Sequence, residues 1–480
     1  MPLSREAIVQ HLRRILGDEQ VVTDPDILQQ RSVDNFRKLQ NIFGVYTMPP
    51  PAAIAMVRST EQAAAVLEFA DEHRVNVVSR TGGTATEGGL ETVVENSIVL
   101  DGSGMNRIVG IDAYNMQATV QCGVPLQILE DEVRKLGLTT GHSPQSKPVA
   151  HLGGLVATRS IGQFSTLYGG IEDMVVGLEV VFPGGRISRI KNVPRRAAGP
   201  DIRHIVIGNE GALCFISEVT VKLFPYMPEN NTFLGWTLKD MKTGFAALRE
   251  VMVAGYKPSV ARLYDPEDGQ LHFSNFAATD DCVVLFMAEG NAGIVKATAE
   301  GIAEIVARFP ECRPIESHFI AEWFADLVWG PDKISREDER IRTTRNVNRT
   351  TEISADWSSI NAIYEAVLPR IRAEINGITL LGGHSSHSYI NGTNMYFNYF
   401  YDLIDCEPVE ENDKYYFPII TIIVEETLRH GGSIVHHHGI GKARSRWVRD
   451  EYGSSYPMLE ALKQAFDPHG IMNAGTIIPR

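Results

Sequence analysis

The sequence is poor in cysteine, and the cysteines it has are not paired in motifs. Five of them, Cys122, Cys214, Cys282, Cys312 and Cys406, are scattered over 480 residues without a C-x-x-C pair. A disulfide framework or a structural zinc site needs an even set or closely spaced ligands, so both are disfavoured. We therefore expect buried, reduced thiols.

Long hydrophobic runs, a signal peptide and an excess of basic charge are absent as well. The longest apolar run, residues 417–424, falls far short of the roughly 20 residues that cross a bilayer. Charges interrupt the N-terminal segment, which is typical of an amphipathic helix capped by Ser4 and not of a signal peptide. With 45 basic and 59 acidic residues the net charge is −14, which disfavours nucleic-acid binding. These features predict a cytoplasmic protein without a transmembrane segment.

Hydrophobic periodicity predicts an α+β protein of two or three domains, as the chain length requires. In residues 49–224 short β-branched runs alternate with helical stretches. The expected strands there are 53–57, 75–78, 97–101, 117–121 and 219–223, the expected helices are 61–73 and 125–136, and the expected hairpin joins 174–182 to 187–190. Further on we expect a strand at 283–287 and helices at 291–309 and 456–466.

The change from alternating short strands and helices in residues 49–224 to longer helices further on divides the chain into three parts. Residues 1–228 form the first domain, which includes an N-terminal helical segment at 1–48. Residues 229–434 form a second domain, and residues 435–480 a C-terminal segment that packs back on the first.

A glycine-rich loop, RTGGTATEGG at residues 80–89, lies between two predicted strands. Glycine lets a backbone approach a ligand closely, so that successive N–H groups can point at a pyrophosphate. The loop is not a Rossmann fingerprint, since Gly82 and Gly83 are adjacent, and Gly441-Lys442 is no Walker A motif, since Ala443 follows. A plain glycine-rich turn is the alternative. Two further segments, 141–169 and 208–212, favour a large cofactor held mainly through backbone contacts.

Taken together, these segments resemble the FAD-binding domain of the vanillyl-alcohol oxidase type, the PCMH fold. GPDIRHIVIGNEGALCFISEVTVKL (199–223) resembles the segment that closes that domain, and FDPHGIMNAG resembles the family's tail. The resemblance implies a two-subdomain FAD-binding domain followed by an α+β substrate, or cap, domain. It also implies non-covalent FAD, because Thr84 stands where some relatives attach the flavin to a histidine.

The same resemblance implies a set of residues in contact with FAD. They come from the glycine loop and from the two later segments: Arg80, Thr81, Gly82, Gly83, Thr84, Ala85, Thr86, Gly141, His142, Ser143, Gly153, Gly154, Thr158, Ser160, Gly162, Glu210, Gly211 and Ile216.

Two branches of the family are similar to this sequence. The alkyl-dihydroxyacetonephosphate synthases are the more similar in sequence, through the motifs ARLYD (261–265), MYF (395–397) and HHHGIGK (436–442). The D-2-hydroxy-acid dehydrogenases, of the D-lactate and glycolate types, are the other branch.

Histidines concentrate in LGGHSSHSY (381–389) and SIVHHHGIGK (433–442). The histidine side chain gains and loses protons near neutral pH. Three histidines in a row before a Gly-x-Gly turn therefore favour an active site over the alternative, buried core histidines whose hydrogen bonds are satisfied. Both branches imply that His438 is catalytic, while His437 stands where the hydroxy-acid branch has a metal-binding glutamate. If a divalent metal is present, His384, His387 and His437 are its expected ligands.

Three further residues complete the predicted site. Tyr396 matches the acid/base tyrosine of the synthases, although an aromatic residue on a half-buried strand is the alternative. Arg262 is the lone charge in an apolar strand and needs a partner, either a substrate carboxylate or phosphate or a nearby acid such as Asp265. Arg342 is a weaker second anion-binding candidate. Arg262, Arg342, His387 and His437 form the expected substrate-binding group.

The implied activity is that of an FAD-dependent oxidoreductase acting on a CH–OH group. The expected substrate is a small anionic alcohol, with a 2-hydroxy acid as the favoured class. It delivers hydride to flavin N5 while His438 takes the hydroxyl proton, and Tyr396 assists this proton transfer. The alternative is a synthase-like transferase that uses FAD without net redox change; the absence of an amphipathic anchor for a fatty alcohol favours the dehydrogenase. The electron acceptor stays open among an electron-transfer flavoprotein, a quinone and oxygen, and a homodimer is implied only at the level of the family.

Overall fold

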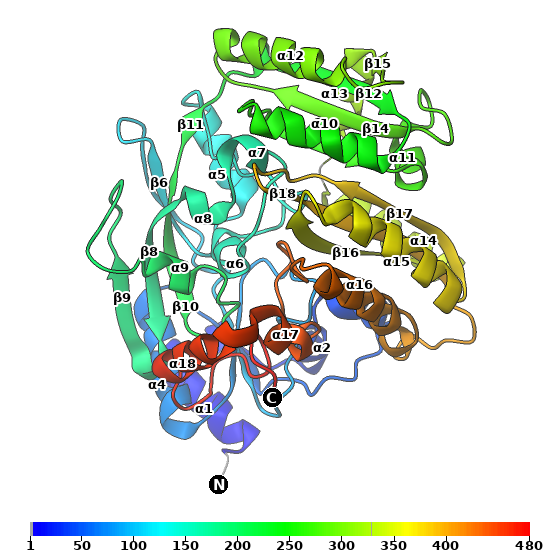
Figure 1. Cartoon of the computed structure of the whole chain (residues 1–480). Coiled ribbons are helices and arrows are strands. Elements are labelled where there is room, and N and C mark those ends of the chain that lie inside the picture. Colours follow the sequence, from blue (N-terminus) through cyan, green and yellow to red (C-terminus); the bar gives the residue numbers. More distant parts are fainter. Residues whose placement is uncertain (1–2, 328) are drawn as a thin grey trace.

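Residues 3–327 and 329–480 are described by the structure, a computed structural model. Two sheets are built from strands within residues 21–222, and a larger sheet is built from strands within residues 232–402 (Figure 1). The predicted boundary at 228/229 thus falls just before the first strand of the large sheet.

The first sheet is mainly parallel and has the order β1-β2-β4-β3 (Val21–Val22, Ala53–Met56, Ile98–Asp101, Val77–Arg80). Helices α1 (Arg5–Leu16) and α4 (Thr60–His73) pack on it, and the side chains of Ser4 and Ser59 cap them. Strand β3 starts two residues later than the predicted 75–78. It therefore ends at Arg80 and leads directly into the glycine loop.

The second sheet is antiparallel, in the order β5-β6-β10-β8-β9 (Ile108–Asp112, Gln117–Gln121, Phe215–Lys222, Val175–Phe182, Arg186–Ile190). The predicted hairpin is confirmed as the pair β8–β9. Helix α5 (Leu126–Arg134) and the short helix α6 (Leu152–Ala157) contribute to its core. Strands β7 (Leu138–Thr139) and β11 (Phe224–Pro225) pair separately nearby.

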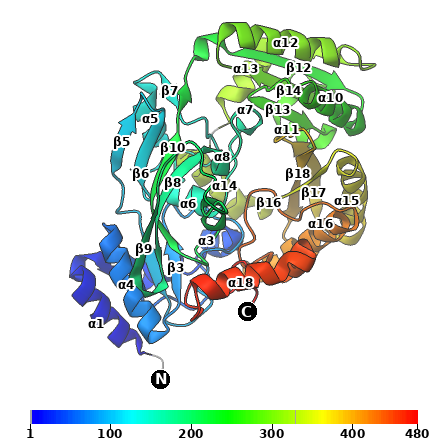
Figure 2. The same ribbon diagram turned by 60° about the vertical axis from the view of Figure 1, so that its left-hand side comes forward.

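The third sheet has seven antiparallel strands in the order β15-β12-β14-β13-β17-β18-β16 (Arg313–Ile315, Thr232–Leu238, Cys282–Ala288, Val260–Tyr264, Ile378–Ser385, Gly392–Asp402, Asn346–Asp356). Its main core includes residues of helices α10 (Met241–Val253), α12 (Ala292–Val306), α15 (Ile360–Glu374) and α16 (Phe417–Arg429). Helix α14 (Pro331–Thr344) lies beside α3 (Lys38–Phe43) (Figure 2). Lys38 and Glu337 form an ion pair between these helices.

The C-terminal segment returns to the first two sheets. Helix α18 (Tyr456–Phe466) brings Phe466 onto Phe182 with a ring separation of 5.0 Å. Beyond it, Met472 forms a parallel bridge with Val77 of β3. Within the described residues, no helix combines the length and the apolar character needed to span a membrane.

Candidate active site

A cavity of about 680 Å³ lies where the glycine loop, α6, the large sheet and the histidine segment meet. Its walls include residues of β13, β16 and β18 on one side and the loop at 80–87 on the other. A volume of this size suits an extended cofactor together with a small substrate.

Two glycines of the loop are required by close backbone packing. A Cβ on Gly82 would lie 2.6 Å from the carbonyl oxygen of Val149. Gly83 has a φ of +71°, and a Cβ there would collide with the guanidinium of Arg80. Side chains at either position would therefore displace the loop from the cavity wall.

Most of the residues expected to contact FAD line this cavity, namely Arg80, Thr81, Gly82, Gly83, Thr84, Ala85, Thr86, Gly153, Gly154, Thr158, Ser160, Glu210, Gly211 and Ile216. Four do not: Gly141, His142, Ser143 and Gly162 lie behind the wall. Their role is packing, since His142 is buried against Ser160, with Nε2 3.2 Å from Oγ, and Gly162 packs on the Ser143 backbone. The neighbouring Pro144, Gln145 and Ser146 line the cavity in their place.

Glu210 lines the cavity and also binds the backbone that follows the histidine triplet. Its carboxylate accepts the backbone N–H groups of Ile440 and Gly441, each at 2.8 Å. Burial raises the pKa of Glu210 to about 7. The segment after the histidine triplet is thereby fastened to the glycine-rich segment at 208–212.

Strand register brings four site residues into one row on the large sheet. Tyr264 of β13 stands opposite His384 of β17, His384 opposite Tyr396 of β18, and Tyr396 opposite Glu352 of β16. The three rings stack, with centroids 4.9 Å apart for Tyr264–His384 and 4.6 Å for His384–Tyr396. Directly opposite residues of an antiparallel pair share a face, so the row points to the histidine segment.

The histidine triplet is held by Glu352. Its Oε1 accepts the backbone N–H of His437 at 3.0 Å and that of His438 at 2.6 Å. The Nδ1 of His438 lies 3.5 Å from the same oxygen and 3.9 Å from Oε1 of Glu87. With Nδ1 facing two carboxylates, the proton of a neutral ring belongs on Nδ1, and Nε2 keeps its lone pair.

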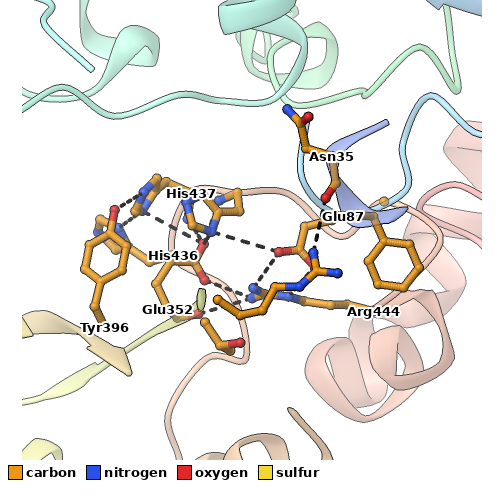
Figure 3. Close-up of polar contacts among 12 residues, drawn as sticks. Asn35, Glu87, Glu352, Tyr396, His436, His437 and Arg444 are labelled. Atoms are coloured by element: carbon orange, nitrogen blue, oxygen red, sulfur yellow. Dashed lines mark hydrogen bonds and ion pairs between the residues drawn. The ribbon is translucent and has the colours of Figure 1, made fainter. Parts of the chain in front are cut away.

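Arg444 joins the two carboxylates, as Figure 3 shows. Its Nη1 lies 2.8 Å from Oε2 of Glu352 and its Nη2 2.9 Å from Oε1 of Glu87. Burial alone would raise the pKa of Glu352, but the charge of Arg444 holds that pKa well below its usual range. Sequence reasoning missed this network because each member lies far from the others along the chain; a lone Glu in β16 and an Arg after the triplet were its only local signals.

Tyr396 lies in the cavity wall, half-buried, with its hydroxyl 2.6 Å from Nε2 of His437. Asn398 and Phe400 line the cavity from the same face of β18, whereas Phe397 and Tyr399 are in the core. Burial raises the pKa of the Tyr396 phenol well above its usual range, so its proton stays bound at neutral pH.

Arg262 reaches the cavity from β13 and is 4% exposed. It does not pair with Asp265: its Nη1 donates to the Tyr264 hydroxyl at 2.7 Å, and its guanidinium lies 5.3 Å from the Trp323 ring centroid. Its buried Nε has no hydrogen-bond partner within the described residues. A buried cation left in this state is suited to an anionic ligand.

Arg342, the second expected anion-binding residue, does not line the cavity. Its side chain is 51% exposed and bonds to Glu339 and to the carbonyl oxygen of Ile42, each at 2.9 Å. Helix α14 thus places the Arg342 side chain at the surface, outside the cavity wall.

The expected metal ligands do not converge. The Nδ1 of His384 is engaged by Asp268 at 2.5 Å. Within the described residues, the groups whose ligand atoms lie within 4.8 Å of one another are His387–His436–His437 and Glu352–His437–His438. In the first group Nδ1 of His436 and Nδ1 of His437 are themselves 2.8 Å apart, as in a hydrogen bond.

The cavity carries unpartnered polar atoms that fit a bound cofactor. Among the described residues, these buried atoms include Ser79 Oγ, Arg80 Nη1, His151 Nδ1 and Gln163 Nε2, all from residues that line the part of the wall near the glycine loop. Buried donors and acceptors are normally satisfied, so a ligand with many polar atoms is their natural partner.

Fold, glycine loop and cavity define a two-domain flavoprotein of the PCMH type. The family described as "FAD binding domain" matches residues 51–191, and "FAD linked oxidases, C-terminal domain" matches residues 227–477. The chain belongs to these FAD-linked oxidoreductases and binds FAD.

Relatives of this chain include proteins of both branches. An "uncharacterized FAD-linked oxidoreductase", YgcU of Escherichia coli K12, is 62% identical over all of this chain and 99% of its own. Alkyldihydroxyacetonephosphate synthase of Caenorhabditis elegans is 28% identical over 89% of this chain and 76% of its own. A mitochondrial D-lactate dehydrogenase [cytochrome] of Saccharomyces cerevisiae is 23% identical over 99% of this chain and 80% of its own. A solved alkyldihydroxyacetonephosphate synthase, 21% identical, shares the fold with a TM-score of 0.80 over all of this chain and 86% of its own.

Proposed function

We propose that this oxidoreductase is a dehydrogenase of small anionic alcohols, with a 2-hydroxy acid as its substrate class. The observation that carries the proposal is Arg262, a buried guanidinium that forms no ion pair within the described residues and lines the same cavity as Tyr396 and His438. One anion-binding group and two proton-handling groups are what the oxidation of a hydroxy acid requires. The D-lactate dehydrogenase relative supports the same class.

In this mechanism Arg262 binds the substrate carboxylate and so orients the hydroxyl-bearing carbon. The lone pair on Nε2 of His438 accepts the hydroxyl proton, and Glu352 and Glu87 stabilise the positive charge that develops on the ring. FAD, when bound, supplies the hydride acceptor. Tyr396 lies beside the triplet and offers its hydroxyl as a second proton-transfer group.

A second candidate is a transferase like the alkyldihydroxyacetonephosphate synthases, in which FAD undergoes no net redox change. The observation that favours it is an apolar part of the cavity wall formed by Leu271, Leu327, Trp329 and Ile334. Such a wall suits an acyl chain, and Arg262 would then hold a phosphate.

Anaerobic spectroscopy of the flavin distinguishes the two. The holoenzyme is mixed with a panel of D- and L-2-hydroxy acids, sugar acids and phosphorylated polyols, and then with acyl-dihydroxyacetonephosphate. Bleaching of the oxidised flavin band by a 2-hydroxy acid is the expected result, and His438→Ala should abolish it. A flavin that stays oxidised with every alcohol but bleaches with acyl-dihydroxyacetonephosphate would favour the transferase instead.

A further inference from the structure

Four side chains form an unbroken line of hydrogen-bond contacts that starts at the cavity. The Tyr396 hydroxyl lies 2.6 Å from Nε2 of His437. The Nδ1 of His437 lies 2.8 Å from Nδ1 of His436, and Nε2 of His436 lies 2.7 Å from the Tyr389 hydroxyl. Each imidazole therefore uses both of its nitrogens within the line.

The line leads away from the cavity. Tyr396 and His437 line the cavity wall, whereas His436 and Tyr389 do not. Tyr389 is partly exposed and follows β17, next to the exposed Ile390. Its hydroxyl is thus the outer end of a path whose inner end faces the ligands.

The charge state of the two histidines suits proton transfer. Burial lowers the pKa of His436 to about 4 and holds the pKa of His437 well below its usual range. A relay through these two contacts requires both rings to be neutral, with one N–H each. A 2.8 Å contact between two Nδ1 atoms then needs one proton between them, so the two rings must be in opposite tautomers.

The groups around the line leave its hydrogen bonds intact, although Oε1 of Glu352 lies 3.9 Å from Nδ1 of His437. His387 stacks on His436 with centroids 5.2 Å apart, and its Nδ1 is taken by the Ser165 hydroxyl at 2.7 Å. Glu352 and His438 lie on the inner side. The charges that act on Tyr389 at the outer end are those of Glu172, Asp173 and Arg159. Burial and the two acids raise the pKa of the Tyr389 phenol, so Tyr389 releases its proton only as another one arrives.

We propose that Tyr396, His437, His436 and Tyr389 form a proton relay that carries the substrate's hydroxyl proton out of the cavity. The relay rests on the dehydrogenase function proposed above. His438, whose ring centroid lies 5.9 Å from that of Tyr396, is restored by passing its Nε2 proton to the Tyr396 oxygen.

The transfer balances at every link. As Tyr396 gains that proton, its own passes to Nε2 of His437, the Nδ1 proton of His437 passes to Nδ1 of His436, and the Nε2 proton of His436 passes to the Tyr389 oxygen. Tyr389 releases its phenolic proton to solvent. One proton leaves the protein, and no link changes its net charge.

The first test needs no substrate. In the holoenzyme labelled with ¹⁵N-histidine, nitrogen chemical shifts report which ring nitrogen carries the proton. We expect His436 and His437 to be neutral and in opposite tautomers, with assignments made from His436→Gln and His437→Gln. Protonation of both nitrogens of either ring at pH 7 would overturn the relay. The relay would also be overturned if both His436 and His437 were Nε2–H tautomers and the protein bound one metal ion per chain, because that result would indicate a metal site at His387, His436 and His437.

The second test is kinetic. Tyr389→Phe removes only the outermost hydroxyl and leaves the cavity wall intact. Steady-state turnover with an artificial electron acceptor, in which His438 must be restored in every cycle, should slow by at least about 10²-fold, the lower range for loss of a positioned proton-transfer group, with substrate affinity unchanged. The solvent isotope effect in D₂O should change as well. Tyr452→Phe, at an exposed tyrosine, is the matched control and should behave like wild type.

Failures of relay and function are distinguishable. If no compound bleaches the wild-type flavin, the dehydrogenase proposal fails, and the tautomers still decide whether the relay geometry exists. If wild type is bleached and Tyr389→Phe matches it in steady-state turnover rate and isotope effect, the relay is wrong while the function stands.

Discussion

Arg444 and Glu352 form an ion pair from which water is fully excluded: Nη1 and Oε2 are 2.8 Å apart, and neither side chain has any exposed area. Because Glu352 also binds the backbone of His437 and His438, and Arg444 also binds Glu87 of the glycine loop, the pair sets the distance between the cofactor loop and the catalytic segment.

Replacing Glu352 by glutamine should destabilise the protein. Loss of one partner of a buried ion pair typically costs about 3–5 kcal/mol, and we expect about 3 kcal/mol because Glu87 still neutralises Arg444. The measurement is the free energy of unfolding from denaturant titration. Glu460→Gln, which breaks an exposed 3.5 Å pair with Arg449, serves as control and should cost under about 1 kcal/mol. Equal losses of unfolding free energy in the two variants would show that the buried pair contributes no more to stability than the exposed pair.

His438→Gln should remove the base and keep the cofactor. We expect flavin reduction to slow by about 10²- to 10⁴-fold, the range for loss of a general base, with normal flavin content and little change in substrate affinity. Stopped-flow reduction at saturating substrate measures this. His318→Gln, at a 53% exposed histidine, is the control. A variant that reduces its flavin at the wild-type rate would assign the base to another residue.

Arg262→Met should weaken binding of the acid and leave binding of its uncharged methyl ester nearly unchanged. A charge-assisted hydrogen bond contributes about 1.5–3 kcal/mol, so the Kd for the acid should rise about 10- to 150-fold. Titration of the flavin spectrum with an unreactive substrate analogue gives both constants. The exposed Arg308 provides the control variant Arg308→Met. If acid and ester lose affinity equally, Arg262 acts through packing and not through charge.

The flavin should leave the protein on denaturation. Thr84 occupies the position at which a histidine could form a covalent bond, and a threonine hydroxyl is a poor nucleophile at neutral pH. Acid precipitation should therefore release all of the yellow chromophore into the supernatant, where absorbance quantifies it. A yellow pellet would contradict this and would point to another nucleophile of the cavity wall, such as His151 or Cys214.

Stability should fall as the pH is lowered below neutral, in part through His142. Burial lowers the pKa of His142 to about 3. Between its unfolded pKa near 6.5 and this value, the unfolded chain binds a proton that the folded protein does not, so stability is lost by up to about 1.4 kcal/mol per pH unit. His142→Asn should flatten the dependence of unfolding free energy on pH between 6 and 4. His204→Asn, at a 50% exposed histidine, should leave the slope unchanged.

Local patterns predicted much of the fold. The hairpin β8–β9, the helix α18 and the Ser4 cap of α1 all depend on residues close together in the chain, where periodicity and capping chemistry act. The alternation in β18 likewise separates Tyr396, which faces the cavity, from Phe397, which lies in the core.

The site was harder to predict where it depends on distant pairing. Arg444 meets Glu352 across 92 residues and Glu87 across 357, and no local pattern records such a contact. Within residues 141–162 the family resemblance identified the segment beside the cavity but not which of its residues face the cavity. Gly153 lines the cavity, whereas Gly162 packs behind its wall. Arg342 likewise could not be placed from local pattern: the turn of α14 that carries it faces solvent.

The anchoring of the glycine loop has a consequence for the order of events during synthesis. Lys442 donates to the carbonyl oxygens of Gly88 and Gly89, and Asn473 donates to that of Gly89 from 384 residues further along. At about 5–20 residues per second, a ribosome makes Asn473 roughly 20–80 s after Gly89. Until then the loop lacks its last supports, so we expect FAD to bind only after Asn473 has been made.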